Sequence, residues 1–299
     1  MKKLLIIFLL VITATAFYFY STKTPETDKI GITKELNQAL SDEELKEKIG
    51  QMILIGFRGT EMNPELEKMI QEIKPGGFIL MDYDLSSKGK IKRNIENPEQ
   101  VKNLIDEIKR VSKITPFIAI DVEGGLVSRL KEKYGFLKIP SAKEMGQGTP
   151  EETKKTAERI ALQLKNLGFN MNFAPVVDVD INPKSPAIGA LGRSFSSNPL
   201  VVIEHAESFI KAHQAQNIIT VLKHFPGHGD TGTDSHYDLP VVKHDRQRLD
   251  SVELYPFRKL IEANVSGIMV AHMSIPTLDD TPNLPTTLSK PVVTDLLKN

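Results

Sequence analysis

Short apolar runs alternate with longer amphipathic stretches along nearly the whole of this chain. The runs have the length of buried strands, and the stretches between them carry apolar residues at helical intervals. Six apolar runs occur, at 52–57, 76–81, 117–120, 169–179, 218–222 and 267–271. Near-continuous apolar strands separated by amphipathic helices predict a parallel sheet covered by helices, and hence an α/β fold.

The stretches between the runs carry helix signals. Ser41 and Glu44 have the spacing of a capping box ahead of apolar residues at helical intervals. The first helix is therefore expected to begin at this point. Further helices are predicted over 64–73, 98–112, 151–167, 199–214, 245–263 and 290–299.

Two α/β architectures fit this pattern, an open doubly wound sheet and a closed barrel. No Gly-x-Gly-x-x-Gly motif follows the first run, and no P-loop motif occurs. Polar clusters instead follow strand after strand, which is where a (β/α)8 barrel places its chemistry. The sequence therefore favours a TIM-type (β/α)8 barrel. Because only six strand–helix units are present, the barrel is expected to be truncated after about six units, with exposed sheet edges.

The N-terminus predicts export from the cytoplasm. A basic start precedes the apolar segment 4–12, and residues 13–16 end in an Ala-x-Ala site typical of a cleaved signal peptide. The alternative is an uncleaved membrane anchor, because residues 4–20 carry no charge and end in aromatic side chains. Either interpretation makes the protein extracytoplasmic: secreted, periplasmic or attached to the membrane. The expected regions are a signal or anchor over 1–20, a linker over 21–37 and the barrel domain over 38–299.

Composition excludes several classes of function. The chain has no cysteine, which excludes disulfides, thiolate zinc sites, a cysteine nucleophile and lipoprotein acylation. Its 38 basic and 38 acidic residues cancel, and no long block of one sign occurs, so no nucleic-acid partner is expected. A small or neutral ligand is the expected partner.

The strongest candidate for catalysis is the loop 223–236, which directly follows the fifth apolar run and contains three of the seven histidines. Asp234 and His236 are two residues apart, so in an extended loop the carboxylate can reach the imidazole and favour its charged form. Such a pair supplies a general acid near neutral pH. Lys223 and His224 can donate hydrogen bonds to a neutral polyhydroxy ligand. A metal site, or a loop ordered by its own hydrogen bonds, remains an alternative here.

Two more polar clusters follow predicted strands. Asp121 and Glu123 stand at the end of the third strand, beside a glycine pair that permits a sharp turn. Asp178 and Asp180 share one face of the fourth strand because side chains alternate along a strand, and Arg193 lies downstream. The simpler alternatives are solvated carboxylates at a turn and a structural ion pair between Arg193 and one of the two later aspartates.

Taken together, these motifs resemble glycoside hydrolase family 3, and specifically its β-N-acetylhexosaminidase branch. The matching segments, in family order, are 49–51, 56–59, 121–129, 173–180, 192–195, Lys-His-Phe-Pro-Gly-His-Gly at 223–229, Asp-Ser-His at 234–236, and 267–272. The resemblance implies a TIM-type barrel and retaining hydrolysis of terminal β-linked N-acetylglucosamine, from muropeptides or related amino sugars. It implies neither a metal nor an organic cofactor.

The resemblance also implies roles for single residues. His236 would be the general acid/base and Asp234 its partner, in place of the usual pair of carboxylates. An aspartate would attack the anomeric carbon, and water activated by His236 would hydrolyse the glycosyl-enzyme. Sugar-binding positions would be Asp121, Arg129, Arg193, Lys223 and His224.

One part of the family pattern is unmatched. The family's nucleophilic aspartate follows a seventh strand, whereas Asp279 and Asp280 follow the sixth. We therefore expect this chain to be a fragment or a truncated product with little or no hydrolase activity by itself. Two alternatives stay open: a family 3 β-glucosidase or glycoside phosphorylase, which the Asp-Ser-His motif disfavours, and a catalytically inactive carbohydrate-binding envelope protein.

Overall fold

The computed structural model describes residues 40–84, 91–233 and 238–299. The chain divides into two units, Met1–Ile49 and Gly50–Asn299. The sheet, the helices that cover it and the candidate site all belong to the second unit, which is described below.

The elements follow one another as repeated strand–helix units. The strands are β1 (Leu54–Gly56), β2 (Gly77–Ile79), β3 (Phe117–Ile120), β4 (Val122–Gly124), β5 (Val127–Ser128), β6 (Met171–Asn172), β7 (Ile219–Phe225) and β8 (Gly267–Val270). The α-helices are α3 (Asp42–Gln51), α4 (Pro64–Ile73), α5 (Pro98–Val111), α6 (Ala142–Met145), α7 (Pro150–Leu167), α8 (Pro199–Gln214), α9 (Arg246–Ser251) and α10 (Tyr255–Glu262). Shorter or irregular helical segments are η2 (Glu132–Tyr134), η3 (Gly189–Leu191), η4 (Thr286–Leu288) and η5 (Pro291–Lys298).

Six of the strands form one parallel sheet in the order β1-β2-β3-β6-β7-β8. Its register places Phe78 opposite Ile118, and Leu222 opposite Ile268. Parallel neighbours need long crossover connections, and α4, α5, α7, α8 and the pair α9 and α10 lie in the five connections of this sheet. The predicted parallel α/β fold is therefore confirmed. Within the described residues β1 and β8 are the edges of the sheet, as expected for a TIM-type fold that stops after about six units.

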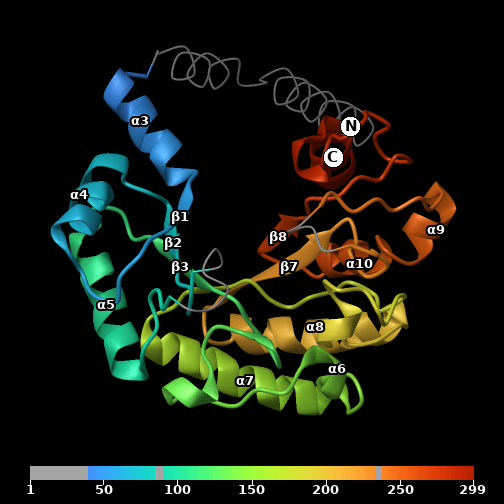
Figure 1. Ribbon diagram of the computed structural model, residues 1–299, viewed down its shortest axis with the longest axis horizontal. Helices are drawn as coiled ribbons and strands as arrows, with labels where there is room; N and C mark the ends of the chain where they lie inside the picture. The colour runs from blue at the N-terminus through green and yellow to red at the C-terminus, as the bar shows by residue number, and fades with distance from the viewer. Residues whose placement is uncertain (1–39, 85–90, 234–237) are drawn as a thin grey trace, which may run out of the picture. The chain divides into compact units, whose positions relative to one another are not determined.

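The crossover helices cover one face of the sheet, and each packs on the next: α4 on α5, α5 on α7, α7 on α8, and α8 on α10 (Figure 1). Their sequence explains why they form and which side they bury. In α5, Asn97 caps the first turn by accepting a hydrogen bond from the amide of Gln100, and Pro98 stands at the first helical position. Its buried side is the predicted apolar face, Val101, Leu104, Ile105 and Ile108.

The hydrophobic core has two main parts. One joins α4, α5 and α7 to the first strands and includes Phe78, Ile105 and Ile118. The other joins α8 and α10 to β7 and includes Leu222 and Phe257. Close packing on this scale fixes the strand ends from which the polar loops start.

Two elements differ from the sequence prediction. The strand expected over 169–179 forms a regular ladder only at Met171–Asn172, and a single isolated bridge joins Val176 to Lys223. Pro175, which lies between them, has no amide proton to donate to a ladder. The helix expected over 245–263 is two helices, α9 and α10, and the break precedes Pro256 in the first turn of α10.

Among the described residues, no helix combines the length and the hydropathy that crossing a bilayer requires. The predicted signal or anchor over 1–20 and the predicted linker over 21–37 lie outside the described residues. Both assignments therefore stay predictions.

Candidate functional site

The candidate site lies at the carboxyl ends of β3, β6 and β7. Asp121 follows β3 directly, Asp178 lies in the segment after β6, and Lys223 and His224 belong to the end of β7. This last strand runs to Phe225, beyond the predicted end of its apolar run. Because the strands are parallel, their carboxyl ends meet at one edge of the sheet, and the side chains of the three segments come together there.

Lys223 is the buried centre of the site, with 2% of its surface exposed. Its Nζ atom lies 2.8 Å from Oδ1 of Asp121 and 2.6 Å from Oε1 of Glu123. Burial opposes ionisation of Glu123, but Lys223 and Arg193 outweigh burial and lower the pKa of this carboxyl to about 2. Burial likewise opposes ionisation of Asp121, and Lys223 and Arg129 lower its pKa. The ammonium therefore faces two ionised carboxylates, which compensate its charge.

Arg193 binds the carboxylate of Glu123 as well and shares its Oε1 atom with Lys223. Its Nε and Nη2 atoms donate to the two oxygens of Glu123 at 2.8 and 2.7 Å, and its Nη1 donates to the carbonyl of Ala187 at 2.7 Å. A two-point contact of this kind fixes both groups in one plane. The sequence alternative that paired Arg193 with Asp178 or Asp180 is wrong, since Glu123 is its partner.

His224 is held as a neutral imidazole with a defined tautomer. Its Nδ1 atom lies 2.7 Å from Oδ2 of Asp178, and its Nε2 atom lies 3.2 Å from Nη2 of Arg193. Because an arginine can only donate, Nε2 accepts and Nδ1 carries the proton. Burial lowers the pKa of His224 to about 4, and the positive charges of Arg193 and Lys223 add to this effect while Asp178 opposes it.

Asp178 also anchors the loop that follows β7. Its carboxylate accepts the backbone N–H of His224, at 3.2 Å to each oxygen, and that of His228 at 2.7 Å. Burial alone would raise the pKa of Asp178, but the contacts with the two histidines lower it. The ring of His228 is buried edge-on to that of His224, with 5.8 Å between centroids. One buried carboxylate thus orients the histidine and the start of the loop.

Arg129 joins this cluster to the end of β2. It lies 3.5 Å from Oδ1 of the fully buried Asp82 and 3.5 Å from Oδ2 of Asp121. The ammonium of Lys131 lies 2.5 Å from the other oxygen of Asp82, and both cations lie over the ring of Tyr83, at 5.8 and 5.0 Å from its centroid. Arg129 is therefore held between two acidic strand ends.

The predicted glycine turn brings Arg129 to this place. Gly124 and Gly125 have φ angles of 107° and 55°, a region that favours glycine. They reverse the chain between β4 and β5, and the amide of Arg129 then donates to the carbonyl of Asp121 at 3.0 Å. The local sequence thus returns a cation to the strand end that carries its partner.

In the structure, all five residues predicted to bind sugar lie together. They are linked by three further carboxylates that the sequence does not assign to the site, namely those of Asp82, Glu123 and Asp178. Glu123 and Asp178 were noted only as strand-end acids, and Asp82 was missed. Their common signal is an acidic residue within a few positions of the end of an apolar run. Three carboxylates pair with four cations in one network, which consists of Asp82, Asp121, Glu123, Arg129, Lys131, Arg193 and Lys223. A fourth carboxylate, Asp178, joins this network through His224, which contacts Arg193.

The histidines of the described residues do not form a metal site. Within the ranges 40–84, 91–233 and 238–299, no group of three His, Asp or Glu side chains is placed to hold a metal ion. His224 uses both ring nitrogens in hydrogen bonds with Asp178 and Arg193. Asp234 and His236, the predicted acid/base pair, lie outside the described residues, so their assignment remains a prediction.

Comparison with known proteins gives consistent matches. The family model described as "Glycosyl hydrolase family 3 N terminal domain" matches residues 44–299. Beta-hexosaminidase A of Pseudoalteromonas piscicida is 36% identical over 259 residues, which are 80% of this chain and 41% of that protein. The beta-hexosaminidase of Methylobacillus flagellatus is 34% identical over 237 residues, 77% of this chain and 64% of that protein.

Solved structures agree with this result. The glycoside hydrolase family 3 β-N-acetylglucosaminidase of Paenibacillus sp. is 37% identical with a TM-score of 0.78, over 87% of this chain and 47% of that protein. This chain therefore spans about half of the length of that structure and 41% and 64% of the two curated relatives.

Proposed function

We propose a function that follows from the family of this chain, which belongs to glycosyl hydrolase family 3 and carries its N-terminal domain over residues 44–299. The proposed reaction is the hydrolysis of terminal β-linked N-acetylglucosamine from amino-sugar glycosides, including those derived from the cell wall. Relatives named as beta-hexosaminidases and as a β-N-acetylglucosaminidase support this substrate class. The match to their sequences spans the ends of β3, β6 and β7, where the polar cluster lies.

The observation that carries the proposal is the charge-balanced cluster around Lys223. Its interior pairs are buried, whereas Asp121, Arg129, Arg193 and His224 each keep a small part of the side chain exposed. The exposed groups include a carboxylate that accepts hydrogen bonds and guanidinium groups that donate them. Fixed donors and acceptors with little net charge suit a neutral sugar. The hydroxyl groups of the sugar can form hydrogen bonds with these groups, and no charge is left unpaired.

We further propose that His236 is the general acid/base and Asp234 its partner. In the first step the imidazolium would protonate the leaving oxygen, and in the second the neutral ring would take a proton from water. The carboxylates of Asp121, Glu123 and Asp178 are unsuited to nucleophilic attack, because each is held by cations or N–H groups and has a lowered pKa. None of these three is proposed as the nucleophile.

Hydrolysis by the full-length gene product tests the substrate class. The 4-nitrophenyl glycosides of β-N-acetylglucosamine and β-glucose are compared with and without phosphate. We expect release from the N-acetylated substrate, with no need for phosphate. A preference for the glucoside would indicate a β-glucosidase, phosphate-dependent formation of a sugar phosphate would indicate a phosphorylase, and sugar binding without turnover would indicate a binding protein.

His236→Ala tests the acid/base assignment separately. General acid–base catalysis contributes about 10²–10⁴-fold, so we expect a loss of this size with a poor leaving group such as methyl. The loss should be smaller with 2,4-dinitrophenol, which departs without a proton. Equal rates of wild type and variant on the methyl glycoside would overturn the assignment.

The extracytoplasmic location is likewise a proposal, supported by the uncharged segment 4–20 and the Ala-x-Ala site at 14–16. Fractionation combined with mass spectrometry of the mature N-terminus tests it. A soluble exported protein that begins near residue 17 indicates a cleaved signal, and an intact membrane-bound chain indicates an anchor. Recovery of the intact chain from the cytoplasm would exclude both.

A further inference from the structure

A concave site lies beside β1, and its lining shares no residue with the cluster around Lys223. This cavity has a volume of about 340 Å³ and is lined by the end of β1 and the residues after it, by α4 and by the segment before α5. None of the five proposed sugar-binding residues lines it. Small-molecule sites begin at about 300 Å³, so the cavity can hold a small ligand or one substituent of a larger ligand.

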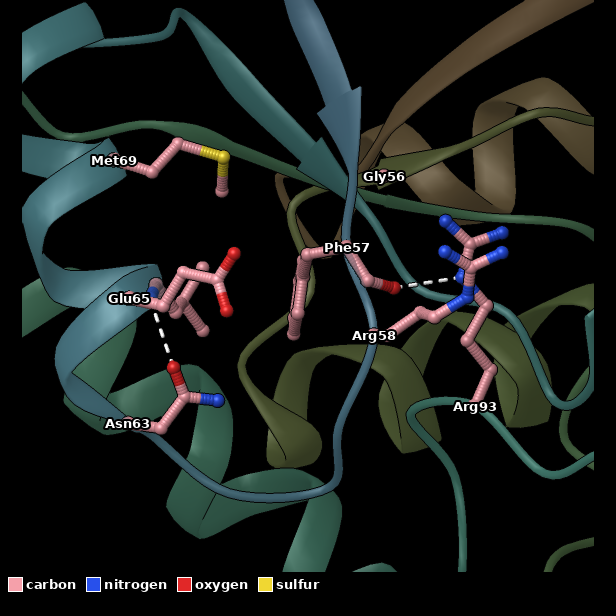
Figure 2. A pocket seen from close by; sticks show the side chains of 8 residues that line it. Gly56, Phe57, Arg58, Asn63, Glu65, Met69 and Arg93 are labelled. Carbon is pink, nitrogen blue, oxygen red and sulfur yellow. Dashed lines mark hydrogen bonds between the residues drawn. The ribbon is translucent and has the colours of Figure 1, made fainter.

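The lining combines an apolar wall with charged ends. Figure 2 shows the side chains of Glu65 and Met69, from α4, on one side of Phe57, and those of Arg58 and Arg93 on the other. The ring of Phe57 is buried against the core, and Met69 is half-buried. A ligand in this cavity would therefore contact an aromatic ring and a thioether, with guanidinium groups within reach.

Arg93 is the distinctive group, because it is a half-buried cation that has no carboxylate partner among the residues the structure describes. Its Nε atom donates to the carbonyl of Phe57 at 2.6 Å. Arg58, by contrast, pairs with Asp84 at 2.6 Å. Among the described parts of the chain, no carboxylate lies within ion-pairing distance of Arg93. Within the described ranges, its two terminal amino groups donate to no protein acceptor and keep their hydrogen-bond donors available.

Gly56 gives the guanidinium of Arg93 its place. A Cβ atom at this position would lie 2.8 Å from Nη2 of Arg93, closer than a carbon and a nitrogen can approach without moving. The glycine therefore leaves room for the guanidinium at the end of β1. Partial burial of an uncompensated charge is unfavourable in the empty protein, and an incoming anion would relieve it.

We propose that this cavity is a carboxylate-binding subsite in which Arg93 recognises the carboxylate while Phe57 and Met69 contact the apolar part of the ligand. The planar guanidinium matches a carboxylate by two parallel hydrogen bonds. Glu65 and Asp84 add negative charge near the cavity, which disfavours a dianion such as phosphate more strongly than a single carboxylate.

Two sources of the carboxylate fit the position of the cavity. The segment after β2 carries Asp84, which pairs with Arg58 at the cavity, and Asp82, which pairs with Arg129 at the sugar site. The carboxylate could thus belong to the leaving group of a glycoside bound at the sugar site, and this arm rests on the proposed function. It could also belong to a free carboxylic acid, and the binding of such an acid would not depend on sugar binding.

Calorimetric titration of the full chain at low ionic strength tests the proposal with matched pairs of probes. The free-acid arm compares 3-phenylpropionate with 3-phenylpropanamide. The glycoside arm compares the 4-carboxyphenyl and 4-carbamoylphenyl N-acetyl-β-D-glucosaminides. In at least one arm the carboxylate should bind about ten-fold more tightly than its amide, the size expected when one charge-assisted contact is lost. The arm that shows the preference identifies the source.

Variants assign the preference to Arg93. Arg93→Gln should abolish the discrimination between acid and amide, whereas Arg110→Gln, at the exposed end of α5, should keep it. Gly56→Ala is a second variant that displaces the guanidinium without removing it and should weaken the discrimination. Equal affinities for acid and amide in both arms of the wild type, or a full preference retained in a folded Arg93→Gln or Gly56→Ala protein, would overturn the proposal.

Arg129→Gln separates this proposal from the proposed function. The variant should lose affinity for the sugar and keep its preference for the free acid, since Arg129 does not line the cavity. Failure of the wild type to bind N-acetylglucosamine would contradict the proposed function and leave the free-acid arm as the test of the cavity.

Discussion

Glu123→Gln should destabilise the protein strongly, because the substitution keeps the shape of the side chain and removes the charge that two buried cations share. Lys223 would keep only Asp121 as its carboxylate partner, and Arg193 would lose both of its contacts to an ionised group. The remaining amide can accept a hydrogen bond but cannot compensate a positive charge. The network would then hold an excess of buried positive charge.

The magnitude follows from the burial of the three groups. Lys223 and Glu123 are almost fully buried. Removing one partner of a buried ion pair costs about 3–5 kcal/mol, so the free energy of unfolding should fall by this amount. For a domain of this size, 1 kcal/mol corresponds to roughly 2–4 °C, so Tm should fall by about 6–20 °C. The folded-state pKa of about 2 lies below the ordinary 4.5. The stabilisation is therefore complete above about pH 4.5 and is lost as the pH falls toward 2.

Urea unfolding followed by circular dichroism measures this effect at pH 7 and at pH 4. Glu151→Gln is the matched control, since Glu151 is exposed in the first turn of α7 and should change stability by less than about 0.5 kcal/mol. The difference between wild type and Glu123→Gln should be smaller at pH 4 than at pH 7. A loss below about 1 kcal/mol at pH 7, or a loss that grows on acidification, would refute the electrostatic account of the cluster.

Two further predictions concern the buried histidines. At pH 7, the ¹⁵N shifts of His224 should show a neutral ring protonated at Nδ1, as its contacts with Asp178 and Arg193 require; an Nε2–H tautomer would contradict the geometry. Burial lowers the pKa values of His213 and His224 from 6.5 to about 4. The free energy of unfolding should therefore decline as the pH falls from about 6.5 toward 4. At 1.36 kcal/mol per pKa unit, the decline should be roughly 3 kcal/mol for each histidine. In His213→Gln the decline measured by urea unfolding between pH 7 and pH 5 should be shallower than in wild type, and an unchanged slope would disprove the assignment for that residue.

Much of the fold could be predicted because the apolar periodicity reports which side of each element is buried. The face of α5 with Val101, Leu104 and Ile108 is buried as predicted, and the glycine turn at 124–125 forms where the sequence indicated it. The split between α9 and α10 was missed, although Pro256 provided a local signal. Apolar residues continue through this break at helical intervals, so periodicity alone extends the helix across it.

The candidate site was predictable in its residues but not in its pairings. Strand ends and the family resemblance indicate Lys223 and Arg193, and in the structure both contact the same oxygen of one carboxylate. Their shared partner, Glu123, lies far from both in sequence, and only the parallel sheet brings the three together. Local spacing instead suggests Asp178 or Asp180 for Arg193, since nothing in the sequence states which of several nearby acids points at a given cation. The cavity beside Arg93 has the same origin, because it forms between segments that are distant in sequence.

We propose that the cluster at the ends of β3, β6 and β7 binds an N-acetylated amino sugar. Calorimetric titration of the chain with N-acetylglucosamine, and with glucose for comparison, tests it most directly. We predict saturable binding of N-acetylglucosamine at one site, a marked loss of affinity in a folded Asp121→Asn variant, and no change in Arg110→Gln. Absence of binding by the wild type, or an affinity that Asp121→Asn leaves unchanged, would contradict the account.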